Sequence, residues 1–147
     1  MKISERGKDF IKRFEGLRLQ AYKCAGGKWT IGYGHTYGVT EGQQITRQQA
    51  EAFLEEDLSI VEAAVNEYVT STLEQHQFDA LVSFTFNVGS GNLRRSTLLR
   101  IVNNAPNAFL AIHKEFLKGC YAGDVKLNGL ILRRSAEAEL YEGIYVE

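Results

Sequence analysis

The chain has 147 residues and a formal net charge of −1 at pH 7; 44% of its residues are hydrophobic and 24% are charged. This length suits one domain that buries roughly 70% of the surface exposed by its unfolded chain. A charge so close to zero gives no support to nucleic-acid binding or to stable membrane association, so we predict neither. The charged start lacks the apolar core of a signal peptide and no apolar run could span a bilayer, so we expect synthesis in the cytoplasm.

Residues 4–15 predict a helix in which Ser4 is the N-cap and Gly16 ends the last turn. One face of this helix is apolar and carries Phe10, Ile11 and Phe14.

From about residue 17 to residue 45 the pattern changes to strands and turns. Alternation over residues 28–34 separates two faces of a strand. We expect the face with Trp29, Ile31 and Tyr33 to pack against the protein. The other face has only small residues and leaves room for a substrate; it carries Thr30, Gly32 and Gly34.

Two capping-box patterns then predict helices. Thr46 with Gln49 precedes a long amphipathic run to about residue 69, and Thr72 with Gln75 precedes a second helix. Shorter helices are expected over 93–103, over 106–118 with Pro106 in the first turn, and over 130–142.

These patterns together predict an α+β fold in one domain, residues 1–147, with two lobes. The small β-rich lobe covers about 15–60, and the helical lobe covers about 61–147 together with the N-terminal helix 4–15. The long helix joins the lobes, and we expect the binding site in the cleft between them. A monomer is the default expectation.

Glu15 lies at the end of the first predicted helix. Glycoside hydrolysis needs a proton donor for the leaving oxygen and a second group on the other face of the sugar. A carboxylate at a helix C-terminus faces the negative end of the dipole, and cover by Phe14 and Leu17 also opposes ionisation, so Glu15 suits the donor role. From position alone, a solvated glutamate ending an amphipathic helix is the more ordinary interpretation.

Residues 14–36, FEGLRLQAYKCAGGKWTIGYGHT, closely resemble the active-site segment of bacteriophage endolysins, the phage-type lysozymes of glycoside hydrolase family 24. The family pattern is Glu, eight residues, Asp or Cys, five residues and Thr, which Glu15, Cys24 and Thr30 meet. The resemblance extends over about residues 4–142 through motifs at 77–84, 86–91, 96–100 and 129–140.

The resemblance implies a lysozyme-like fold, no cofactor, and a muramidase that cuts the β-1,4 bond between N-acetylmuramic acid and N-acetylglucosamine with inversion. It implies that Glu15 is the general acid and that Cys24 with Thr30 positions and activates water. Four further positions look like cleft-lining positions of the family, with ordinary core or capping use as the alternative: Thr36, Phe86, Asn87 and Ser96.

Many relatives have Asp where this chain has Cys24. An ordinary Asp, with a pKa near ~3.9, is ionised at pH 7, whereas an ordinary thiol near ~8.5 is mostly protonated. Lys23 and Lys28 could lower the pKa of the thiol, as adjacent cations do. A thiolate could act as a base or attack the sugar directly with retention, and an inert thiol is the bland alternative.

Arg133 or Arg134 could pair with Glu15, the other being a surface charge, and the sequence does not say which. A Cys24–His35 dyad of a thiol hydrolase is disfavoured because such pairs usually come from distant segments. The three histidines lack metal-binding spacing, so we predict no metal site, and two cysteines are too few for a disulfide framework.

The resemblance further implies that the glycan strands of peptidoglycan are the substrate and that the enzyme reaches the wall from the host cytoplasm after a separate membrane lesion, such as a holin makes. Two alternatives stay open, a lytic transglycosylase and a catalytically dead wall-binding module. The host species, and whether an N-terminal anchor belongs to the protein, are also open.

Overall fold

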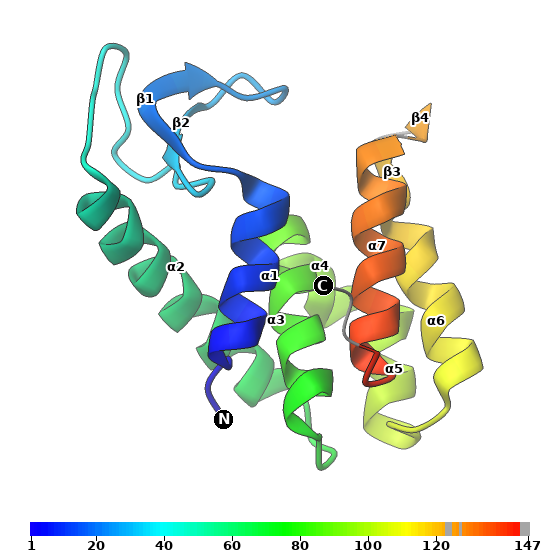
Figure 1. Ribbon diagram of the computed structural model, residues 1–147. Helices are drawn as coiled ribbons and strands as arrows, with labels where there is room; N and C mark the ends of the chain where they lie inside the picture. Colours follow the sequence, from blue (N-terminus) through cyan, green and yellow to red (C-terminus); the bar gives the residue numbers. More distant parts are fainter. Residues whose placement is uncertain (123–124, 127, 145–147) are drawn as a thin grey trace.

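The computed structural model describes residues 1–122, 125–126 and 128–144, with the side chains of 120–122 and 125–126 left aside. Helices dominate it, and a small antiparallel hairpin, which follows α1 and precedes α2 in the chain, lies at one end (Figure 1). The elements in chain order are α1 (Glu5–Glu15), β1 (Arg18–Lys23), β2 (Trp29–Gly32), α2 (Arg47–Tyr68), α3 (Gln75–Val88), α4 (Ser90–Arg95), α5 (Thr97–Asn104), α6 (Phe109–Leu117), the 3-10 turn η1 (Lys118–Cys120), β3 (Tyr121–Ala122), β4 (Val125–Lys126) and α7 (Asn128–Tyr141).

Helix α3 is the centre of the helical part. It packs against α1, α2, α4 and α7, and every residue from 77 to 85 is buried. A helix that is buried all round must satisfy its polar side chains internally, which brings Asp79 and Ser83 into contact with other helices. None of the helices in the described ranges is long and apolar enough to cross a membrane.

Helix α1 begins and ends where the sequence predicts. The hydroxyl of Ser4 accepts a hydrogen bond from the Gly7 amide at 3.0 Å, which caps the first turn. Gly16 ends the helix at a positive φ of 71°, and its amide donates to the Lys12 carbonyl at 2.9 Å. Glu15 is therefore the last residue of α1, and the two caps fix its position in the helix.

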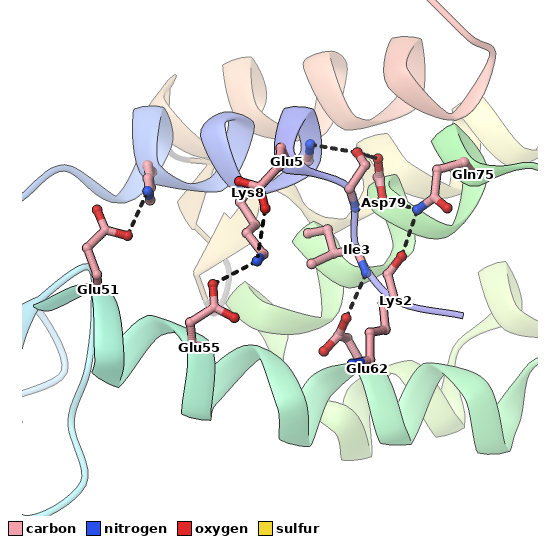
Figure 2. A network of polar contacts seen from close by, with 12 residues as sticks. Lys2, Ile3, Glu5, Lys8, Glu51, Glu55, Glu62, Gln75 and Asp79 are labelled. Atoms are coloured by element: carbon pink, nitrogen blue, oxygen red, sulfur yellow. Dashed lines mark hydrogen bonds and ion pairs between the residues drawn. The ribbon is translucent and has the colours of Figure 1, made fainter.

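Polar contacts lock α1 against α2 and α3 (Figure 2). Lys8 pairs with Glu55 of α2 at 2.7 Å. At the start of the chain, the Ile3 amide donates to Glu62 at 2.7 Å and the Ser4 amide donates to Asp79 of α3 at 3.0 Å. Although each exposed ion pair is weak, the contacts run along most of α1 and fix the position at which Glu15 emerges.

The β1–β2 hairpin follows the predicted alternation only as far as Gly32. Tyr22 pairs with Thr30, and Lys23 pairs with Trp29. At Gly32 φ is +66°, and the chain turns back so that the His35 amide bonds to the Ile31 carbonyl at 2.9 Å. The expectation that Gly32 faces a substrate is therefore wrong; the turn directs it onto its neighbours Ile45 and Ala50.

Of the two predicted capping boxes, the first is confirmed and the second is wrong. Thr46 and Gln49 cap α2 as expected. Helix α3 begins only at Gln75, with Glu74 as N-cap and Gln77 returning a 2.8 Å bond to its amide. Gln77 is buried and also donates to Asn107 at 3.0 Å, a distant contact that sequence alone does not reveal.

The helix predicted over 93–103 is two helices, because Ser96 interrupts it. The Ser96 hydroxyl accepts from the Leu99 amide at 3.0 Å and donates to the Leu93 carbonyl at 2.7 Å, which caps α5. Pro106 lies in the turn before α6 instead of in its first turn. The last helix is confirmed within two residues at its start, and the short β3–β4 hairpin was not predicted.

The two capping patterns give a matched pair of variants. We expect Thr46→Ala to lower the free energy of unfolding by about 1 kcal/mol, because an amide at the start of α2 loses its acceptor. Thr72→Ala should change it by less than about 0.5 kcal/mol, since Thr72 is exposed and caps no helix. Urea unfolding measures both, and equal losses would contradict the assigned caps.

Candidate active site

A cleft of about 590 Å³ lies between the β1–β2 hairpin with its following loop, the middle of α2 and the end of α3. Six of the seven predicted site residues line it: Glu15, Cys24, Thr30, Thr36, Phe86 and Asn87. Ser96 is not among the residues that line it, and its hydroxyl caps α5, which is the alternative that the sequence left open.

Glu15 is held by Arg133 of α7. The guanidinium Nη1 donates to Glu15 Oε2 at 2.6 Å, and only 16% of the Glu15 side chain is exposed. Such short charge-assisted contacts fix geometry as well as charge. This settles which arginine meets Glu15: it is Arg133.

Arg133 is itself held in place by a cluster of buried side chains. Its Nε donates to Glu137 at 3.2 Å, and its Nη2 donates to the Ser83 carbonyl at 3.1 Å. Glu137 also accepts from the Ser83 hydroxyl at 2.5 Å. Burial raises the pKa of Glu137, and the charges of Arg134 and Arg133 oppose that rise.

Arg134 is fully buried, so the prediction that the second arginine is a surface charge is wrong. It lies 2.9 Å from Glu137 and donates a hydrogen bond to the side-chain oxygen of Asn87. Two neighbouring arginines of α7 thus share one buried carboxylate, Glu137, and each of them contacts a different cleft residue, Glu15 or Asn87. The available signal for this cluster was the position of Glu137, which follows Arg133 by four residues and Arg134 by three.

Cys24, directly after β1, and Thr30, in β2, both line the cleft from the hairpin. Cys24 is a partly exposed free thiol, and Thr30 is buried with its hydroxyl 3.1 Å from the Lys28 carbonyl. Backbone hydrogen bonds from Lys28 and Gly26, followed by one from the Thr30 hydroxyl, lower the pKa of Cys24. These hydrogen bonds stabilise the thiolate.

The predicted cause of a lower Cys24 pKa, the lysine ammonium groups, is therefore not the one found. Lys23 points its ammonium over the Trp29 ring, 5.4 Å from its centroid, and does not line the cleft. Lys28 acts on the thiol through its backbone.

His35 has structural partners. Its Nδ1 lies 2.8 Å from Asp57 and its ring stacks on Phe53 at a centroid distance of 4.3 Å. These contacts attach the loop after β2 to α2, which supports a structural role instead of a partnership with Cys24. No group of three possible metal ligands occurs within the described ranges.

Sequence reasoning missed several residues that shape the cleft because nothing local marks them. Tyr37 and Ile60 are exposed large apolar side chains on the loop after β2 and on α2, and both line the cleft. Further lining residues not singled out before are Tyr22, Asp57, Val61, Val88 and Gly89.

A match to the sequence model described as phage lysozyme covers residues 12–137, which contain Glu15, Cys24, Thr30 and the arginines of α7. The chain belongs to the phage lysozyme family. It is thus a glycoside hydrolase of the lysozyme type, as the motif spacing predicts.

Relatives of this lysozyme are phage endolysins. An endolysin of Acyrthosiphon pisum secondary endosymbiont phage 1 is 45% identical over 146 residues, 97% of this chain and 99% of that protein. The endolysin of Bacillus phage PZA is 43% identical over 96% of this chain, which spans only 55% of that longer protein.

Solved structures support the lysozyme-like α+β fold. An endolysin from Escherichia coli O157:H7 phage FAHEc1 matches with a TM-score of 0.89 and 36% identity, covering 100% of this chain and 98% of that one. The muramidase domain of SpmX from Asticaccaulis excentricus matches with a TM-score of 0.86 and 41% identity over 95% and 97% of the two chains. The predicted fold class is confirmed.

Gly34 gives a test of how tightly Glu15 is placed. A Cβ at Gly34 would lie 2.6 Å from Glu15 Oε1, and φ there is +78°. We expect Gly34→Ala to cost about 1–2 kcal/mol of stability through the left-handed backbone and to reduce kcat up to about 10²-fold by displacing the carboxylate.

Gly38→Ala is the matched control, since φ is +70° there and a Cβ would meet nothing within 4 Å. It should lose similar stability and keep its activity. Urea unfolding and turbidity assays at a temperature where both variants are folded measure the two effects. Equal activity in the two variants would contradict the close placement of Glu15.

Proposed function

We propose that this enzyme is a muramidase of host cell lysis, which hydrolyses the β-1,4 bond between N-acetylmuramic acid and N-acetylglucosamine. The observation that carries the proposal is that Glu15, from the end of α1, and the pair Cys24 and Thr30, from the hairpin, line one cleft. Inverting hydrolysis requires an acid and a water-activating group on opposite faces of the sugar, and groups on separate elements of one cleft can take such positions.

In the proposed reaction Glu15 gives its proton to the glycosidic oxygen as the bond from that oxygen to the anomeric carbon breaks. The carboxylate that remains is stabilised by Arg133, whose guanidinium is already in place at 2.6 Å. Because Glu137 and Ser83 hold Arg133, no rearrangement is needed as charge develops on Glu15. Arg133 is thus a positioning residue.

Cys24 serves as the base in its thiolate form. It takes a proton from a water molecule while the oxygen of that water bonds to the anomeric carbon from the opposite face, which inverts the configuration. Thr30 supports this step, since its side chain helps to lower the pKa of the Cys24 thiol. The lowered pKa of Cys24 makes more thiolate available near neutral pH than an ordinary cysteine would supply.

Thr36, Phe86 and Asn87 would contact the sugars. The side-chain oxygen of Asn87 is taken by Arg134, so its amide N–H groups are left to donate to the substrate. We further infer one domain with its lobes divided near residue 60, acting as a monomer. It is made in the host cytoplasm and reaches peptidoglycan after a separate holin opens the membrane.

Replacing the acid tests the assignment of Glu15. We expect Glu15→Gln to lower the rate by about 10²–10⁴-fold, the usual contribution of general acid catalysis. Glu41→Gln is the control, because Glu41 is exposed and does not line the cleft. Turbidity loss of permeabilised cells gives the rate. Mass spectrometry of wild-type products should show reducing ends, one water heavier than the anhydro ends of a lytic transglycosylase. Clearance by Glu15→Gln at the parental rate would overturn the assignment.

The pH profile tests Cys24. If thiolate is the active form, the kcat/KM of the parent divided by that of Cys24→Asp rises with pH through the Cys24 pKa, because the aspartate is already ionised above about pH 6. The ratio is the relevant quantity, since the loss of the general acid's proton with rising pH is common to both enzymes. The lowered pKa of Cys24 puts the rise below the pKa of an ordinary thiol. Cys24→Ala should lose most activity. A constant ratio between about pH 6 and 9, or an active Ala variant, would contradict the role.

A further inference from the structure

The charged side chains of the cleft are paired, with one exception. Glu15 is bound by Arg133 at 2.6 Å, and Asp57 lies 2.8 Å from His35. Within the described part of the chain, Lys28 is the charged cleft residue whose side chain has neither an ion pair nor a hydrogen bond. It is also exposed, so its ammonium is available to a ligand.

The backbone of Lys28, by contrast, is held firmly. Its carbonyl accepts from the Cys24 amide at 2.9 Å and from the Thr30 hydroxyl at 3.1 Å. The backbone of Lys28 also lowers the pKa of the Cys24 thiol. The side chain therefore starts from a fixed point beside the reacting groups, which reduces the entropy lost when it binds a ligand.

The anionic chemistry of peptidoglycan lies on one arm of the sugar. The glycan backbone is uncharged, but the lactyl ether of muramic acid carries either a free carboxylate or a peptide that bears carboxylates. On the basis of the proposed muramidase function, we propose that Lys28 binds a carboxylate on this lactyl arm and so selects muramic-acid strands over uncharged glycans.

Two exposed apolar residues of the same cleft also suit such a substituent. Tyr37 is 89% exposed and Ile60 is 69% exposed, and both line the cleft. A cleft that offers exposed apolar surface as well as an unpaired cation matches a substituent that combines methyl groups with a carboxylate.

The test compares kcat and KM on soluble glycan strands in three forms: strands with their peptides, strands stripped of peptide by an amidase, and peptide-bearing strands with all carboxylates converted to methylamides. Lys28→Gln removes the charge and keeps the backbone. Lys23→Gln is the control, since Lys23 neighbours Cys24 in sequence but lies over Trp29.

We expect Lys28→Gln to raise KM about two- to fivefold on carboxylate-bearing strands, the range of an exposed ion pair, with a smaller effect on kcat. The effect should shrink at high salt. Amidation should raise KM for the parent by the same factor and leave Lys28→Gln unchanged, whereas Lys23→Gln should behave like the parent. If Lys28→Gln raises KM only on peptide-bearing strands, the bound carboxylate belongs to the peptide. If it raises KM only on stripped strands, the carboxylate is that of the lactyl group.

An equal change in KM on native and amidated strands, or no change on native strands, would overturn the assignment of Lys28. The assignment would also be overturned if a shift in the alkaline limb of the pH profile of Lys28→Gln explained its whole loss of activity, because Lys28 would then act on Cys24. If amidated strands are not cleaved by the parent while Lys28→Gln cleaves native strands normally, the required carboxylate binds elsewhere. Failure of the parent on all muramic-acid strands would instead refute the proposed function.

Discussion

The site depends on one buried carboxylate. Glu137 has no exposed surface, yet it faces two arginines, one of which reaches Glu15 and the other Asn87. A buried charge is costly unless it is paired and hydrogen-bonded, so the cluster tolerates few other arrangements. Helix α7 supplies Glu137 and both arginines, α3 supplies Ser83 and Asn87, and α1 supplies Glu15. The packing of these three helices and the placement of the acid are therefore set by the same contacts.

In the proposed mechanism the hairpin has a different task, because a thiol must there act as the base that an aspartate provides in many relatives. Aspartate would be ionised at neutral pH without help, whereas Cys24 needs hydrogen bonds to its sulfur. The tight turn from Cys24 to Lys28 supplies them from backbone amides, and Thr30 on the paired strand adds a hydroxyl. These donors are uncharged, so the ammonium of Lys28 is not needed at the thiol, which is compatible with the carboxylate contact that we propose for it.

Much of this could be predicted from the sequence where the cause is local. The caps at Ser4 and Thr46, the end of α1 at Gly16, and the spacing of Glu15, Cys24 and Thr30 all depend on nearby residues. The failures have distant causes. Gln77 caps α3 because Asn107 holds its amide, and Gly32 is covered because α2 passes beside it. The burial of Arg134 follows from the crossing of α3 and α7, which no short pattern records. The cap that Ser96 forms at α5 has a local cause, and the sequence had offered it as one of two roles for this residue.

The claim that Glu15 and Cys24 act from opposite faces of the sugar is tested most directly by the configuration of the first product. Proton NMR during the first minutes of hydrolysis, before mutarotation, distinguishes the two anomers at the new reducing end. Water activated by the Cys24 thiolate predicts the α-anomer from the β-linked substrate. A β-anomer would contradict the account, because it would mean that the sugar keeps its configuration, as it does when the sulfur itself bonds to the anomeric carbon.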